Sequence, residues 1–242
     1  MKITRGSLRS LVLALALAAA VAEPGAAAGP SFDCAGRRGP VETAICRSEK
    51  LSKLDLRIDA AYRRVMRAWS ADPATREELR YVQRRFLDDR EAAIAEPDDG
   101  LARHLEAQAI LLEAIDTAPR TGFEGEWGNV AGGLRITRDA TGLVLWGNAV
   151  EPLRFRWVCD VDDRGVVAGS GFVAPPEAVA ANFPGWSMRL ERVAGMVRVL
   201  EVGPPGTETT SDGRALAQTP KCGRRGSFDG TYFPTRSRLG TE

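Results

Sequence analysis

The spacing of apolar residues divides the chain into two parts. In the first part, apolar residues recur at steps of three and four along residues 51–69, 79–93 and 101–115. This spacing places them on one face of a helix and predicts three amphipathic helices. Ser48 or Ser52 can cap the first helix, and Asp72 followed by Pro73 suits the start of the second. Because the connections are short, sequential helices are expected to be antiparallel neighbours in a bundle.

In the second part the pattern changes to alternation. The segment 153–161, LRFRWVCDV, predicts a strand with Arg154 and Arg156 on its polar side. Strands are also expected at 134–137 and 143–146, and in a hairpin about Ala194 and Gly195. Six to eight short strands with glycine-bearing turns, one of them at 162–165, favour a small antiparallel β-barrel or sandwich.

Breaker residues separate the two parts. The segment 117–125, TAPRTGFEG, contains proline and two glycines. The predicted fold class is therefore α+β. A helical domain at 29–118, stapled by a disulfide, precedes an antiparallel β domain at 119–242.

The N-terminus is typical of an export signal. Three basic residues precede an apolar run from about Leu11 to Ala20, and small residues follow. This arrangement predicts a signal peptide over 1–28, cut after Ala22 or, alternatively, after Ala28. The run is shorter than the roughly 20 residues of a membrane span. We expect a periplasmic or secreted protein without membrane insertion after cleavage, with an uncleaved anchor as the alternative.

The cysteine count agrees with export. The four cysteines are Cys34, Cys46, Cys159 and Cys222. An even number in an exported chain predicts disulfides. Zinc is disfavoured because the chain has one histidine and no close cysteine pair. One bridge in each domain is the simplest pairing, and the two pairings that join the domains are the alternatives.

Charge and chemistry both argue against several functions. The formal charge of +1 falls to about −1 or −2 once the signal is removed. A near-neutral chain lacks the basic surface of a nucleic-acid-binding protein. His104, expected to be a partly exposed helix residue, is the single histidine and has no nucleophile beside it in the sequence. The acidic pairs at 98–99 and 162–163 lie in predicted turns. We therefore expect no catalytic residues, no metal and no cofactor.

Two segments resemble a known family. Residues 31–66, SFDCAGRRGPVETAICRSEKLSKLDLRIDAAYRRVM, and residues 79–92, LRYVQRRFLDDREA, are similar to the N-terminal domain of LprI-type lysozyme inhibitors. The matching positions are Ser31, Phe32, Asp33, Cys34, Ala35, Val41, Glu42, Ile45, Cys46, Leu51, Leu54, Asp55, Tyr62, Leu79, Arg80, Gln83, Leu87 and Arg90. Phe86 stands where the family has tryptophan, Glu91 where it has aspartate, and the family's later cysteines are missing. The resemblance covers about residues 31–116 and not the β domain.

The resemblance implies an exported, noncatalytic protein that binds a lysozyme by protein–protein occlusion. Arginines could donate hydrogen bonds to the acidic groups in a lysozyme groove. The candidate contact residues are Arg37, Arg38, Arg154, Arg156 and Ser170. For Asp33 and Asp55 we expect structural roles. The alternative function is an envelope module whose β domain holds a small apolar molecule or a glycan near its tryptophans, and a hydrolase is a distant third.

Overall fold

The computed structural model describes residues 29–36, 38–168, 171–174, 185–208, 219–223 and 225–236. For residues 166–168 and 171–174 it describes the backbone alone. The predicted signal peptide, Arg37 and Ser170 lie outside the described residues.

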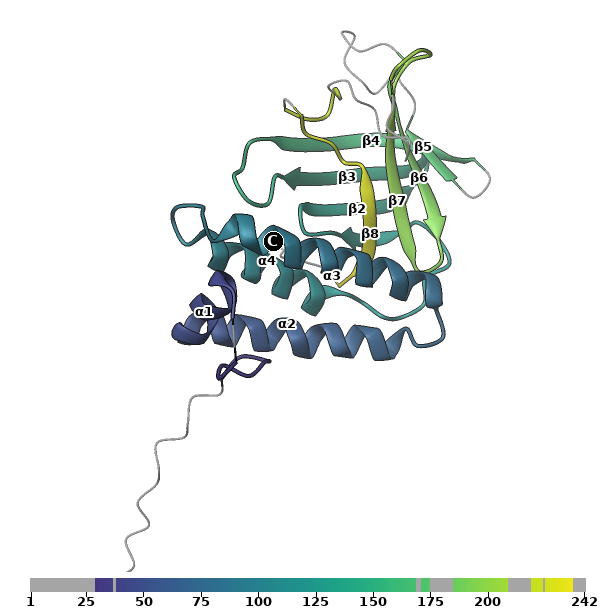
Figure 1. Cartoon of the computed structure of the whole chain (residues 1–242). Coiled ribbons are helices and arrows are strands. Elements are labelled where there is room, and N and C mark those ends of the chain that lie inside the picture. Colours follow the sequence, from purple (N-terminus) through teal and green to yellow (C-terminus); the bar gives the residue numbers. More distant parts are fainter. Residues whose placement is uncertain are drawn as a thin grey trace, which may run out of the picture.

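Four helices form the first part of the chain (Figure 1). They are α1 (Pro40–Arg47), α2 (Glu49–Ala68), α3 (Pro73–Ala93) and α4 (Gly100–Ala114). The three long helices match the predicted ones, and α1 adds a short helix inside the first disulfide loop. Both α2 and α3 pack against α4. In Figure 1, α3 and α4 lie between α2 and the strands.

The predicted caps start two of the helices. The Leu51 N–H donates to Ser48 Oγ at 3.3 Å at the start of α2. At the start of α3, the Thr75 N–H donates to Asp72 Oδ1 at 3.0 Å, and Pro73 occupies the first helical position. Each cap satisfies a backbone donor that the first turn of a helix leaves without a partner.

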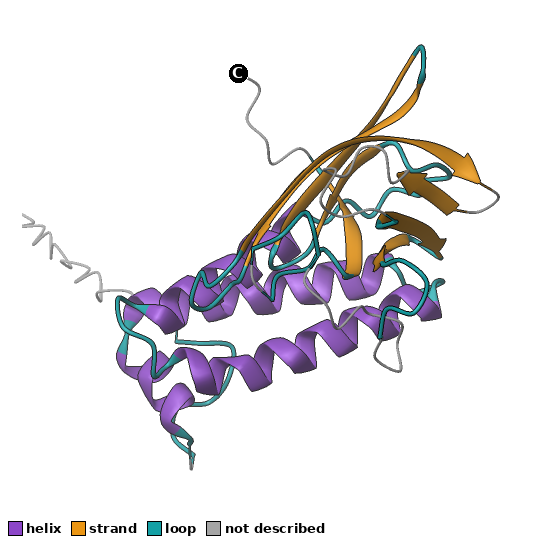
Figure 2. Ribbon diagram, turned by 90° about the horizontal axis from the view of Figure 1, so that it is seen from above, coloured by secondary structure: helices purple, strands orange, loops and turns teal. Residues whose placement is uncertain are grey.

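Eight antiparallel strands form a closed barrel (Figures 1 and 2). Each strand pairs with the next along the chain, and β8 pairs with both β7 and β1 to close the barrel. The strands are β1 (Gly125–Gly128), β2 (Gly132–Asp139), β3 (Gly142–Val150), β4 (Val158–Ala168), β5 (Gly171–Ala174), β6 (Ser187–Val193), β7 (Met196–Val202) and β8 (Gly230–Thr235). The barrel, rather than the sandwich, is therefore the correct form of the predicted fold.

Two predicted hairpins are confirmed. Asp139 pairs with Gly142 at the end of the β2–β3 hairpin, and Val193 pairs with Met196 at the end of the β6–β7 hairpin. Ala194, in the second turn, has a φ of 52°, which is in the left-handed region that such tight turns require.

The prediction for residues 153–165 was partly wrong. The strand begins at Val158, so Arg154 and Arg156 lie in the preceding loop and not on a strand face. The Glu151 carboxylate accepts the N–H groups of Leu153 and Arg154, which fixes a local turn instead of a strand ladder. The expected turn at 162–165 is also absent, because β4 runs through it to Ala168.

Side chains fill the interior of the barrel. The buried residues of this core include Phe123, Trp127, Leu134, Ile136, Leu143, Leu145, Val161, Met188, Leu190, Val197, Val199, Phe228 and Tyr232. Trp127 is 1% exposed, and its indole N–H donates to Phe123 O at 2.6 Å. The large aromatic side chains make this a packed core.

The helices and the barrel share a second core. Met196 of β7 and Phe233 of β8 belong to the same buried cluster as the apolar faces of the helices. The ring of Phe233 stacks on Trp69, at the end of α2, with 5.9 Å between ring centroids. Backbone hydrogen bonds join Asp116 N to Pro234 O and Arg236 N to Ala114 O. The last strand is therefore fastened to the end of the last helix.

Two disulfides are present, and their pairing is the simplest one predicted. Cys34 bonds to Cys46, and Cys159 bonds to Cys222. The first bridge closes the segment that contains α1, and the second holds residues 219–223 against β4. No described helix is long and apolar enough to cross a membrane.

Candidate functional site

A groove between α2 and α3 is the candidate site. It has a volume of about 210 Å³ and is open to solvent. Its lining consists of Ser31, Phe32, Asp55, Ile58, Asp59, Tyr62, Gln83, Phe86, Leu87 and Arg90. The N-terminal segment contributes Ser31 and Phe32 to the lining, and the Ser31 N–H is bonded to Asp55 of α2.

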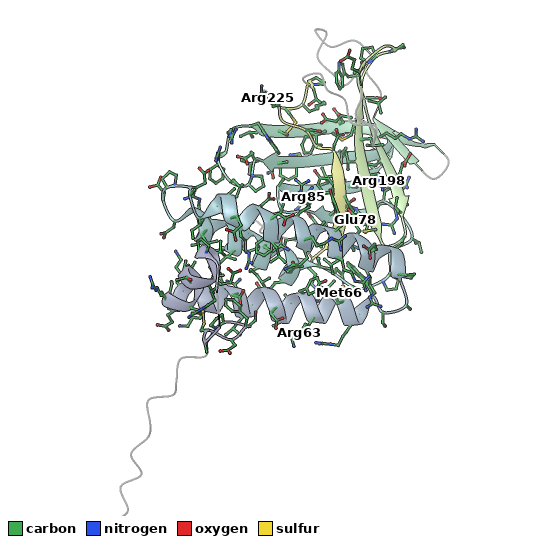
Figure 3. The ribbon with its side chains drawn as sticks, in the orientation of Figure 1. Arg63, Met66, Glu78, Arg85, Arg198 and Arg225 are labelled. Carbon is green, nitrogen blue, oxygen red and sulfur yellow. A yellow bond between two sulfur atoms is a disulfide. The ribbon has the colours of Figure 1, made fainter. Side chains whose placement is uncertain are left out.

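The two helices build the groove in the same way. On α2 the lining residues begin at Asp55 and follow at steps of three, four and seven, ending at Tyr62. On α3 the same steps lead from Gln83 to Arg90. This spacing puts each set on one face of its helix. Figure 3 shows the orientation of α2, with Met66 toward the bundle and Arg63 away from it.

The floor of the groove rests on α4. The Phe86 ring stacks on His104 of α4 with 4.9 Å between centroids. The Gln83 Oε1 accepts a hydrogen bond from Gln108 Nε2 at 3.0 Å. His104 and Gln108 are 2% and 0% exposed, so the face of α3 that lines the groove is held from below by buried side chains.

His104 is buried, and the expectation of a partly exposed histidine was wrong. Its Nε2 lies 3.3 Å from Phe86 O. Burial lowers the pKa of the imidazole, because the charged form loses its hydration. The ring fills space between α3 and α4, which is why the fold removes it from solvent.

Three charged residues line the groove, and they differ in their partners. Asp59 pairs with Arg63 at 2.8 Å. Arg90 pairs with Glu42 at 3.3 Å, and its guanidinium lies 5.8 Å from the centroid of the Phe86 ring. Asp55, 7% exposed, accepts the Ser31 N–H at 2.7 Å. Asp55 thus anchors the N-terminal segment to α2, which is the kind of structural role expected for it.

The predicted contact arginines do not gather at this groove. Arg38 is exposed in the first disulfide loop, where its Nε donates to Gly36 O at 3.1 Å. Arg154 pairs with Glu96 of the α3–α4 connection, and Arg156 is exposed in the loop before β4. The sequence interpretation therefore missed the groove. The repeated helical spacing of polar and aromatic residues on α2 and α3 was the signal that could have found it.

The acidic pairs have different surroundings. Asp98 and Asp99 lie in the predicted turn, both with positive φ. Asp163, expected in a turn, is 2% exposed on β4 and pairs with Lys221 at 2.6 Å. Within the described ranges, no group of three or more His, Cys, Asp or Glu residues is arranged to hold a metal ion.

Comparison with known proteins gives one match. Residues 34–119 match the family model described as lysozyme inhibitor LprI. This segment covers the helices and ends before the barrel, which agrees with the limits of the resemblance seen in the sequence. No curated protein and no solved structure matches the chain.

The groove collects the positions that carry the family resemblance. Among its ten lining residues, seven are motif positions: Ser31, Phe32, Asp55, Tyr62, Gln83, Leu87 and Arg90. Phe86, where the family has tryptophan, is an eighth lining residue. Motif residues from three separate segments therefore meet at one concave surface.

Proposed function

We propose that this is an exported, noncatalytic protein that inhibits a lysozyme by binding it and blocking its active-site groove. The family match over residues 34–119 supports a lysozyme-inhibitor-like role for the helical unit. The observation that carries the proposal is the convergence of motif residues on the α2–α3 groove. These residues line a concave surface that is open to solvent, so a partner can reach them.

Export is part of the proposal. Both disulfides need an oxidising compartment to persist, and the family is one of lysozyme inhibitors. The periplasm or the outside of the cell is therefore the location we propose. There the protein would meet lysozymes that attack the cell wall.

A noncatalytic mode of action fits the side-chain chemistry. All four cysteines are in disulfides, so none supplies a thiolate. The single histidine is buried between two helices with a lowered pKa, and its recorded hydrogen-bond contact is the backbone oxygen of Phe86 rather than a nucleophile. Occlusion of a partner needs neither group.

The first disulfide loop offers a second contact surface next to the groove. Arg38 is exposed within it, and the Cys34–Cys46 bridge restricts the conformations of the loop. A loop that is already ordered loses less conformational entropy when it binds. Arg38 could donate charge-assisted hydrogen bonds to the carboxylates of a glycosidase groove.

The test is a titration of the purified mature protein against c-, g- and i-type lysozymes. We expect saturable inhibition of at least one class, with a stoichiometry near one inhibitor per enzyme. A groove variant, Tyr62→Ala, should inhibit more weakly, while Arg198→Ala on the barrel should behave as the wild type. Absence of inhibition for all three classes at micromolar excess would remove the lysozyme function.

The alternative of a ligand inside the barrel receives less support. Trp127 lies inside a packed core, whereas Trp146 is 39% exposed on the outer face of β3. The tryptophans therefore do not line a common internal pocket. A packed interior leaves little room for a ligand inside the barrel. Protein binding by the helical unit is therefore the better-supported of the two functions.

A further inference from the structure

The Asp55 carboxylate is buried in the wall of the groove without a cation beside it. Its recorded partner is the Ser31 N–H, and no ion pair among the described residues includes it. An ionised carboxylate has about four lone-pair sites, so one amide donor leaves acceptor capacity free. A buried charge of this kind gains from a partner that brings both positive charge and N–H donors.

The other charged groups in the groove each have an opposite charge beside them. Asp59 is paired with Arg63, and Arg90 is paired with Glu42 through one terminal nitrogen, while the Arg90 Nε is buried without a hydrogen-bond acceptor in the described part of the chain. The remaining charge of the groove is therefore that of Asp55, and it is negative. The complementary ligand is a cation.

The uncharged lining suits the same kind of ligand. Tyr62 of α2 brings an aromatic ring to the groove, whereas the Phe86 ring of α3 already stacks on His104 and has the Arg90 guanidinium 5.8 Å from its centroid. The face of an aromatic ring such as that of Tyr62 attracts ammonium and guanidinium groups. Ile58 and Leu87 add apolar surface, against which the methylene stem of a lysine or arginine can lie.

We propose that this groove receives one lysine or arginine side chain that projects from the surface of the protein partner. The cationic group contacts Asp55, and its stem lies among Tyr62, Ile58 and Leu87. A volume of about 210 Å³ fits one long side chain and is small for a glycan chain. The inference rests on the proposed function for the partner's identity as a lysozyme, and it specifies which chemistry of that partner is recognised.

The first experiment tests the groove without a lysozyme. Nuclear magnetic resonance titrations of the mature protein would use N-acetyl-arginine amide, N-acetyl-lysine amide and the neutral analogue N-acetyl-citrulline amide. We expect the cationic probes to shift groove amides of α2 and α3 and the neutral one to leave them unchanged. Asp55→Asn should abolish these shifts. The asparagine Oδ1 can still accept the Ser31 N–H, so the fold is retained.

The matched control is Asp88→Asn, which removes the same charge from an exposed position of α3 outside the groove. It should bind the cationic probes as the wild type does. Equal shifts from citrulline and arginine amides, or equal losses in the two variants, would overturn the inference.

The second experiment uses a lysozyme that the wild type inhibits. Asp55→Asn should weaken the inhibition by about tenfold or more, and Asp88→Asn should not. Inhibition that is unchanged in Asp55→Asn would overturn the inference and leave the proposed function intact. Specific binding of the cationic probes without inhibition of any lysozyme would support the inference and remove the lysozyme as the partner.

Discussion

At the scale of single residues, the Glu201 carboxyl group is the clearest case of a charge state set by the fold. It is 2% exposed, and its Oε2 accepts the Phe228 N–H at 2.8 Å and the Ser227 hydroxyl at 2.9 Å. Burial raises its pKa to about 7, against an ordinary value of 4.5, despite these hydrogen bonds. The protonated form is therefore favoured in the folded protein over a wide pH range.

This shift predicts a stability that depends on pH. Because the folded pKa is raised, the contribution of Glu201 is fully present below pH 4.5 and is lost as the pH rises through about 7. The loss amounts to about 3 kcal/mol at high pH. Denaturant unfolding at pH 5 and pH 8 should show this difference between the wild type and Glu201→Gln, which has no proton to lose. Parallel pH profiles for the two proteins would contradict the assignment.

His104 gives a second prediction. It is the one histidine of the chain, so its imidazole signal can be assigned without ambiguity. Its pKa is lowered by burial, so the stability that it contributes is present above about 6.5 and is lost as the pH falls through the lower folded value. A nuclear magnetic resonance titration of the imidazole should give a single curve with a midpoint below 6.5. A midpoint at or above this value would mean that the ring is solvated.

At the scale of elements, the two disulfides differ in the length of chain that they close. The cysteines are separated by 12 positions in one bridge and by 63 in the other. In the chain-entropy model, the shorter loop stabilises by about 3 kcal/mol and the longer by about 4 kcal/mol.

The double variant Cys159→Ala/Cys222→Ala should therefore lose more stability than Cys34→Ala/Cys46→Ala. Denaturant unfolding of both variants measures the two losses against the oxidised wild type. A larger loss for the shorter loop would show that local packing, and not loop length, decides the effect.

The sequence predicted those elements whose pattern was set by local chemistry. The helices and their caps at Ser48 and Asp72 were predictable, because apolar periodicity and capping are local properties. Residues 153–157 were not, because the Glu151 side chain binds the backbone of the following residues and ends the alternation. Asp163 was predicted in a turn from the DDRG sequence of residues 162–165, because the ion pair that holds it on β4 is made with Lys221, 58 positions away in the chain.

The groove was likewise not predictable from local sequence patterns alone. The residues of each helical stripe could be read from their spacing, but the meeting of the stripes depends on how α2 and α3 pack against α4. The family resemblance named most of these residues without showing that they form one surface. Packing between segments, rather than local preference, determines the site.

At the scale of the whole molecule, the shared core predicts that helices and barrel unfold together. Trp69 is 8% exposed and lies against Phe233 of the last strand. Trp69→Ala should lower the free energy of unfolding by about 3–5 kcal/mol, because it leaves a large cavity between the two parts.

The wild type should also show coincident transitions in its helical circular dichroism signal and in its aromatic signals. The control for Trp69→Ala is Tyr81→Ala, which removes an aromatic ring that is 46% exposed on α3. It should cause little loss in the free energy of unfolding. Separate transitions for the two signals would show that the helices are stable without the barrel.

The position of β8 has a consequence for biosynthesis. A growing polypeptide emerges with its N-terminus first, whereas Phe233 and the backbone partners of Ala114 and Asp116 belong to β8 and the residue after it, which follow the other seven strands in the chain. The helical unit, although made first, therefore lacks part of its apolar cover until β8 has been synthesised. The helical core is completed only after the barrel strands have emerged.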